Sequence, residues 1–126
     1  WKSKKNFQSF SIKDGDLIVI DFLTKYYGRL KKINEETKKY NSEAIFVTQK
    51  IHKNHPIANA LNKINIMSKK FCIENSVICL PLDEKVNFEQ EEDFYDGIHT
   101  RPSGNKKIAK YLSNELKEII GYSLKN

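Results

Sequence analysis

The sequence predicts an α/β fold: a three-layer α/β/α sandwich in which helices cover both faces of a parallel sheet. Three short apolar runs, at residues 17–22, 45–49 and 77–80, are the predicted strands. Continuous apolar runs of this length are typical of strands that are buried on both faces. Segments with helical spacing separate the runs, and this alternation favours three neighbouring parallel strands joined by helical crossovers.

The first half of the chain supplies two of the strands. Residues 1–15 suggest a short helix and a loop, and the β-branched run 17–22 is the first predicted strand. Apolar side chains then recur at helical spacing over residues 26–40, which predicts an amphipathic helix. Residues 44–49 are the second strand, and Pro56 is placed to begin a helix that continues to Phe71.

The second half contains the third strand and the last helix. Residues 77–82 form the strand, and Pro81 limits its end. Residues 83–96 are acidic and irregular, which predicts a solvated loop. Pro102 begins the last helix and Gly121 is suited to its left-handed stop. The predicted buried face of this helix consists of Ile108, Leu112, Leu116, Ile119 and Ile120.

The composition is that of an ordinary folded domain. The 126 residues are 39% hydrophobic and 30% charged, and no apolar run approaches the length of a membrane span. The net charge is +6, but only Arg29 and Arg101 among the 22 basic residues are arginines. The lysines are scattered rather than gathered into a stripe, so we expect no nucleic-acid partner, although a basic nucleic-acid-binding domain stays an alternative.

The cysteines and two of the histidines suggest no metal site. Cys72 and Cys79 are predicted to be buried free thiols. His52 and His55 lie in a polar loop without a carboxylate or cysteine close by in the sequence, so a solvated loop is favoured over metal ligation. We therefore expect no metal here, and the family resemblance given below implies no organic cofactor either.

A carboxylate and an imidazole stand three residues apart in the segment 93–104, at Asp96 and His99. A turn with this spacing can hold the carboxylate against one ring nitrogen and leave the other nitrogen free. This is the base half of a nucleophilic triad, in which the carboxylate fixes the tautomer and the histidine takes a proton from the nucleophile. We predict a bond of about 2.6–3.2 Å between Asp96 and Nδ1 of His99, with Nε2 facing an open crevice. The alternative is a loop whose Asp and His make only local hydrogen bonds.

Two further residues are candidates for binding a substrate. Gln49 ends the second predicted strand, at the carboxyl edge where parallel sheets gather their functional groups. Arg101 follows His99 by two residues and is suited to an anionic substrate group. Bonding of Arg101 to local carbonyls, or its pairing with the acidic loop, is an equally weighted alternative.

The order Asp96-Gly97-Ile98-His99-Thr100, followed by Gly104 and Ile108-Ala109, resembles the last conserved block of the SGNH/GDSL hydrolases. By order of elements, the resemblance covers roughly residues 16 to 120. It implies an SGNH-hydrolase or flavodoxin-like sandwich and an acyl-serine mechanism. It also implies a nucleophilic serine after the first strand, with a Gly and an Asn completing the oxyanion hole.

The earlier blocks of that family are missing here. Gly15-Asp16 is followed by Leu17 instead of a serine, and Leu23-Thr24-Lys25 stands where a Gly-x-Asn-Asp is expected. We predict a single domain over residues 1–126 that lacks the nucleophile segment and the oxyanion loops. A break between Phe22 and Tyr26 and the start at Trp1 would fit an incomplete chain. A non-catalytic relative that serves as a binding module is the competing interpretation.

The resemblance implies a function for the complete protein. We expect a serine-dependent ester hydrolase or acyl transferase, with His99 as general base and then acid, and Asp96 holding its ring. The expected partner is a small-molecule, carbohydrate or lipid ester.

Overall fold

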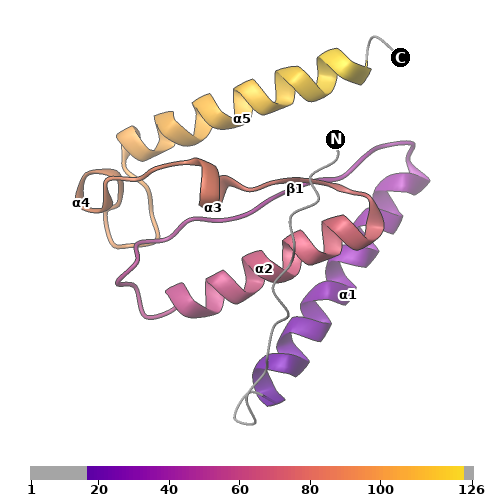
Figure 1. Cartoon of the computed structure of the whole chain (residues 1–126), viewed down its shortest axis with the longest axis horizontal. Coiled ribbons are helices and arrows are strands. Elements are labelled where there is room, and N and C mark those ends of the chain that lie inside the picture. The colour runs from indigo at the N-terminus through magenta and orange to yellow at the C-terminus, as the bar shows by residue number, and fades with distance from the viewer. Residues whose placement is uncertain (1–16, 124–126) are drawn as a thin grey trace.

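The computed structural model describes residues 17–123, and helices dominate this part of the chain (Figure 1). Residues 1–15, for which the sequence suggested a short helix and a loop, lie outside this range. The elements in order are α1 (Leu17–Lys39), β1 (Ile45–Val47), α2 (Ala58–Asn75), β2 (Ile78–Leu80), α3 (Leu82–Lys85), α4 (Gln90–Asp93) and α5 (Pro102–Ser123). The sheet consists of β1 and β2 alone within residues 17–123. The predicted three-layer α/β/α sandwich is therefore wrong, and the described chain is a small helix-rich domain.

The first predicted strand is the beginning of a helix. Residues 17–22 form the first turns of α1, which runs unbroken to Lys39. No glycine or proline separates this apolar run from the amphipathic segment that follows, so the helix propagates through both. Leu23 and Leu30, seven positions apart, are buried on one face. The predicted break between Phe22 and Tyr26 is also wrong, because both residues lie inside this continuous helix.

The other two predicted strands do pair as expected. β1 and β2 are parallel, with Ile45 opposite Ile78 and Val47 opposite Leu80. The N–H of Thr48 donates to the carbonyl of Leu80 at 3.0 Å and continues the pairing by one residue. Parallel strands need a long crossover, which α2 provides. The carboxyl ends of the two strands therefore meet at one edge, as the sequence predicted.

The core lies between α1, α2 and the strand pair. Leu30, Phe71 and Cys72 are its buried members, and Phe71 has no exposed surface. The rings of Tyr27 and Phe46 meet Phe71 edge to face, with centroids 5.2 and 5.5 Å away. These T-shaped contacts join α1 and β1 to α2 through the side chain of Phe71.

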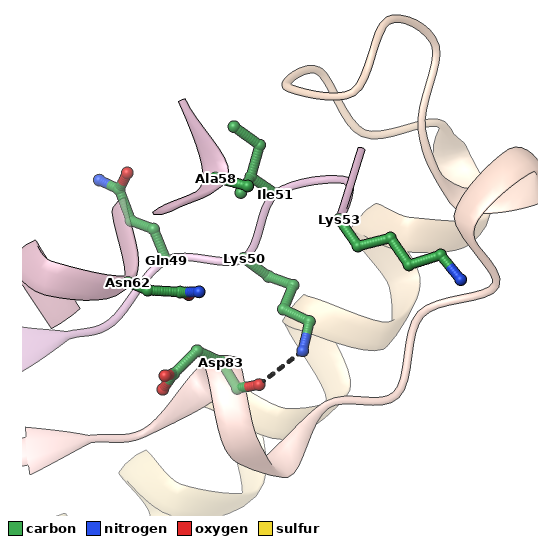
Figure 2. Close-up of a pocket in the computed structure, with 7 residues that line it drawn as sticks. All are labelled: Gln49, Lys50, Ile51, Lys53, Ala58, Asn62 and Asp83. Atoms are coloured by element: carbon green, nitrogen blue, oxygen red, sulfur yellow. Dashed lines mark hydrogen bonds between the residues drawn. The ribbon is translucent and has the colours of Figure 1, made fainter. Parts of the chain in front are cut away.

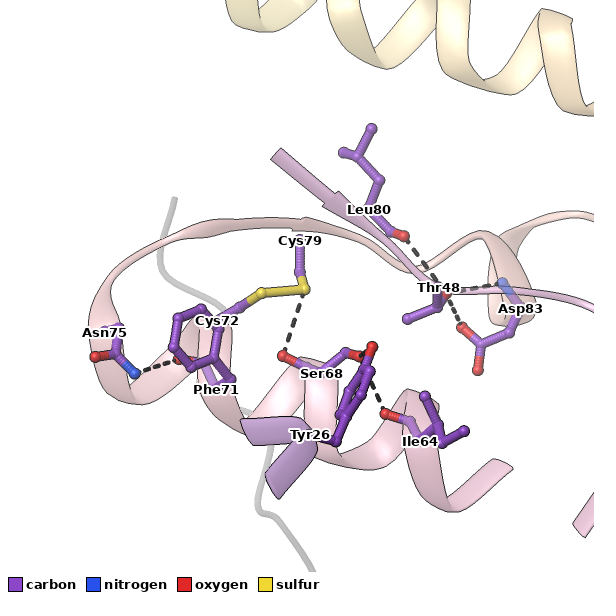
Figure 3. The surroundings of a disulfide bond; sticks show 10 residues. All are labelled: Tyr26, Thr48, Ile64, Ser68, Phe71, Cys72, Asn75, Cys79, Leu80 and Asp83. Carbon is purple, nitrogen blue, oxygen red and sulfur yellow. Dashed lines mark hydrogen bonds between the residues drawn. A yellow bond between two sulfur atoms is a disulfide. The ribbon is translucent and has the colours of Figure 1, made fainter. Parts of the chain in front are cut away.

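A disulfide joins Cys72 of α2 to Cys79 of β2, so the prediction of two free thiols is wrong (Figure 3). Ser76 ends α2 in the left-handed conformation, and the N–H of Val77 bonds to the carbonyl of Cys72 at 2.9 Å. This cap turns the chain back along the helix and brings the two Cα atoms to 5.9 Å, within the range of a disulfide. The reversal of the chain at Ser76 therefore brings Cys72 and Cys79 together.

The last helix lies on the opposite side of the strand pair from α1 and α2 (Figure 1). It begins at Pro102 as predicted, but it continues through Gly121 to Ser123 instead of stopping there. Its predicted apolar face is covered only in part. Ile108, Leu112 and Ile119 are half-buried, whereas Leu116 and Ile120 are exposed. The segment between α3 and α5, which carries the candidate site, joins this helix to the carboxyl edge of the strands.

Candidate active site

The segment between α4 and α5 forms a closed turn. Phe94 and Thr100 make an isolated antiparallel bridge, and the N–H of Tyr95 donates to the carbonyl of His99 at 2.8 Å. Gly97 lies at the tip with φ of +87°, a conformation that side chains other than glycine rarely adopt. The chain thus folds back within seven residues and presents residues 96–99 at its tip.

The Asp96–His99 pair makes the predicted contact, but His99 lines neither of the two hollows described below. Oδ2 of Asp96 lies 2.6 Å from Nδ1 of His99, which confirms the expected contact. Because the carboxylate can only accept, Nδ1 carries the proton and Nε2 is left as an acceptor. The imidazole is 74% exposed, so it is not sealed against α5, and within residues 17–123 no hydrogen bond to its Nε2 is seen.

The second carboxylate oxygen of Asp96 is held by the backbone of the turn. Oδ1 accepts the N–H groups of His99 at 2.8 Å and Ile98 at 3.0 Å. These bonds favour the ionised form, so the N–H of His99, its ring and the N–H of Ile98 hold the pKa of Asp96 well below its usual range. The carboxylate stays charged beside the imidazole near neutral pH, and can stabilise an imidazolium.

The base of the turn is anchored by Asp93, which is 1% exposed. Its Oδ2 lies 2.5 Å from Nζ of Lys107 in α5 and accepts the N–H of Glu89 at 2.7 Å. The bond from Lys107 is the main cause that lowers the pKa of Asp93. The carbonyl of Asp93 accepts the N–H of Arg101 at 2.7 Å. The acidic stretch, predicted to be a solvated loop, therefore contains a buried anchor that fixes the turn to α5.

Arg101 is bound within the turn itself. Its Nε donates to the carbonyl of Phe94 at 2.9 Å, and its guanidinium lies 4.6 Å from the centre of the Tyr95 ring. Of the alternatives that the sequence left open, the local carbonyl is the one observed. The side chain is half-buried and supports the neck of the turn. Binding of a substrate anion by Arg101 stays a prediction.

Gln49 belongs to a different hollow from the Asp96–His99 pair. Its backbone is clamped by Asn65, whose Oδ1 accepts the N–H of Gln49 at 3.0 Å and whose Nδ2 donates to its carbonyl at 2.7 Å. Gln49 lines a polar cavity of about 210 Å³ with Lys50 and Asp83, and Lys50 Nζ donates to the Asp83 carbonyl at 2.8 Å (Figure 2). Asp96 and His99 do not line this cavity, so the structure does not bring Gln49 to them.

A second hollow, of about 310 Å³, is lined in part by Asp96. The post-β1 loop, residues 51–57, forms one wall with His52 and His55, and the turn forms the other with Tyr95 and Gly97. Sequence reasoning treated the two histidines as a solvated loop. Instead, they pack against the turn. The only feature of the sequence that could have indicated this is that both histidines follow a strand whose carboxyl end lies at the edge near the turn.

The described residues contain neither a nucleophile beside the histidine nor a metal cluster. The hydroxyl of Ser103 donates to the carbonyl of Glu92 at 2.8 Å, and that of Thr100 donates to Asn105. Among residues 17–123, no group of three or more His, Cys, Asp or Glu side chains could hold a metal ion. Of the two hydroxyls that flank His99, neither is bonded to its Nε2. The pair can accept and return a proton, but it needs a nucleophile from elsewhere.

Searches against protein families, curated proteins and solved structures find no match for this chain. In the part of the chain that the structure describes, no helix is both long and apolar enough to cross a membrane.

Proposed function

We propose that the Asp96–His99 pair is the general base of a serine-dependent ester hydrolase or acyl transferase of the SGNH/GDSL type. The observation that carries the proposal is the bond of 2.6 Å between Oδ2 of Asp96 and Nδ1 of His99, on a side chain that is 74% exposed. An imidazole held in this tautomer can take a proton only through Nε2. That is the direction in which a nucleophilic hydroxyl would have to approach.

The reaction would proceed in two halves. In the first, Nε2 of His99 takes the proton of a serine hydroxyl, whose oxygen attacks the ester carbonyl; the imidazolium then protonates the departing alcohol. In the second half, Nε2 takes a proton from water or an acceptor alcohol, which attacks the acyl-serine and returns the serine hydroxyl. Asp96 remains ionised throughout, because the turn satisfies both of its oxygens. The nucleophilic serine would come from outside residues 17–123.

A non-catalytic binding module is the second candidate. The observation in its favour is that neither hydroxyl flanking His99 bonds to Nε2: Ser103 and Thr100 bond elsewhere. In that case the Asp96–His99 bond would only shape the turn, as side-chain bonds do in many loops.

The test is ester hydrolysis by the purified full-length protein, with p-nitrophenyl acetate as substrate and a fluorophosphonate probe to trap the serine. We expect His99→Ala to abolish turnover and probe labelling. Asp96→Asn should lower turnover by roughly 10³-fold or more, because the amide favours the wrong tautomer, as in the serine proteases. Lys106→Ala, an exposed change on the adjoining helix, is the matched control and should leave turnover unchanged.

Two results would overturn the proposal. Turnover that survives His99→Ala would remove the histidine from the mechanism. A wild-type protein that neither hydrolyses the ester nor reacts with the probe would favour the binding module.

A further inference from the structure

The tip of the turn rests directly on the post-β1 loop. The backbone N–H of His52 donates to the carbonyl of Gly97 at 2.8 Å. Gly97 is the residue after Asp96, so this bond fixes the peptide unit beside the carboxylate. The turn is therefore held by its own hydrogen bonds and also by a residue 45 positions earlier in the sequence.

Gly97 and the two histidines are packed so closely that a Cβ at position 97 would fit only if the histidines shifted by a few tenths of an ångström. A Cβ built on Gly97 would lie 3.0 Å from Cδ2 of His55 and 3.2 Å from Cβ of His52. Contacts at these distances require the neighbours to move, and the left-handed φ of Gly97 adds strain to any substitution. The missing side chain is therefore what allows the turn to sit on the loop.

The post-β1 loop is also bonded to α4, the helix that precedes the turn. Nε2 of His52 lies 2.9 Å from Oε1 of Glu91 in α4, and the His52 ring meets Phe94 edge to face with centroids 6.2 Å apart. The N–H of Lys53 donates to Oε1 of Gln90 at 2.7 Å. The His52 side chain is only 12% exposed, and these contacts hold it between α4 and the turn.

We propose that His52 is a positioning residue for the Asp96–His99 pair and acts through Gly97. Its backbone fixes the tip of the turn, and its ring fixes the loop to α4. As a result, Asp96 holds Nδ1 of His99 before any substrate arrives. This inference rests on the proposed function. The competing explanation is that the bonds from Ile98 and His99 to Asp96 suffice to hold the turn alone.

The readout that separates the two explanations is the tautomer of His99, followed by ¹⁵N NMR of the imidazole in the whole protein. Free neutral imidazole side chains favour the Nε2–H form, whereas the bond to Asp96 selects Nδ1–H. A pH titration of the Asp96 carboxyl by ¹³C NMR adds an independent signal, because its pKa is held well below the usual range only while the turn is closed.

Gly97→Ala is the main variant, and Gly28→Ala is its control because nothing lies within 4 Å of the Cβ at that helical site. We expect Gly97→Ala to convert His99 to the Nε2–H form and to raise the pKa of Asp96 toward the ordinary value, while Gly28→Ala changes neither. His55→Ala should restore part of the Nδ1–H signal in the Gly97→Ala background, because it removes the contact at 3.0 Å but not the strain at φ.

A second pair of variants tests the ring of His52 without touching its backbone. His52→Ala should reduce the Nδ1–H population of His99, and His52→Gln should retain most of it, because the amide can still reach Glu91. Circular dichroism and the melting temperature report whether each variant folds. Should Gly97→Ala unfold the protein, the His52 pair decides the question.

Retention of the wild-type tautomer and Asp96 titration in folded Gly97→Ala, or in His52→Ala, would overturn the inference. The NMR readouts do not depend on turnover. If they change as expected in a protein without esterase activity, the positioning role stands and the proposed function fails.

Discussion

The ion pair between the buried Asp93 and the partly exposed Lys107 offers the sharpest test of how the site is held together. The change is Lys107→Ala, with Lys106→Ala as the control. Both substitutions remove one lysine from the same helix, but Lys106 is exposed and Lys107 has its Nζ 2.5 Å from Oδ2 of Asp93. The two variants therefore differ in the loss of this contact and not in net charge.

The expected magnitude follows from the burial of Asp93. Its carboxylate is 1% exposed, and among residues 17–123 its Oδ1 has no hydrogen-bond partner. Removal of Lys107 therefore takes the strongest partner from a buried charge that keeps its bond from the N–H of Glu89. Breaking a fully buried pair costs about 3–5 kcal/mol. Because the Lys107 side chain is 36% exposed, solvent weakens the pair, and we expect a loss of about 2–3 kcal/mol in the free energy of unfolding. The control should change it by less than about 0.5 kcal/mol.

The assay is urea denaturation of both variants at several pH values. The pKa of Asp93 in the folded protein lies below the ordinary value of 3.8 for an Asp carboxyl, so its pairing stabilises the protein above that value. This stabilisation is lost as the pH falls through the folded-state pKa. The difference between Lys107→Ala and the wild type should therefore shrink in acid. Equal stability of Lys107→Ala and Lys106→Ala at pH 7 would refute the reasoning, because Asp93 would then not depend on Lys107.

Two further predictions concern the core. Replacing both Cys72 and Cys79 with alanine should lower the free energy of unfolding by roughly 2.5 kcal/mol, the loop-entropy estimate for a sequence separation of 7. A thiol assay that finds two free thiols in the unreduced wild type would contradict the pairing. Phe71→Ala should lower the free energy of unfolding by about 3–5 kcal/mol, because it removes a ring with no exposed surface that Tyr27 and Phe46 both contact. Calorimetry measures this loss. A change below about 1 kcal/mol would show that the core lies elsewhere.

The candidate pair was predictable from the sequence because its geometry is local. Asp96 and His99 are three residues apart, and an Asp in a turn bonds readily to the N–H groups two and three positions later. The same chain segment therefore supplies the carboxylate, the ring and the backbone donors. The pairing of residues 45–47 with residues 78–80 was also predictable, since two short apolar runs separated by a helix favour a parallel crossover.

The helix at residues 17–22 was not predictable from the run alone. A short β-branched segment suits a buried strand and a buried helix equally by composition. In the folded chain α1 packs on α2, with Leu30 in the core that they share, and the helix extends back through the apolar run. The disulfide likewise depends on the chain reversal at Ser76, a backbone feature that the spacing of the cysteines does not reveal.

The sequence by itself determined the tautomer-setting contact of His99, because every group in that contact belongs to one turn. Only the tertiary structure decided what holds the turn in place. His52 lies 45 positions before Gly97, and Lys107 lies 14 positions after Asp93, yet both meet the turn across the molecule. Contacts of this kind arise from how α4 packs on α5 and how the post-β1 loop meets α4 and the turn, and no local pattern of residues encodes them.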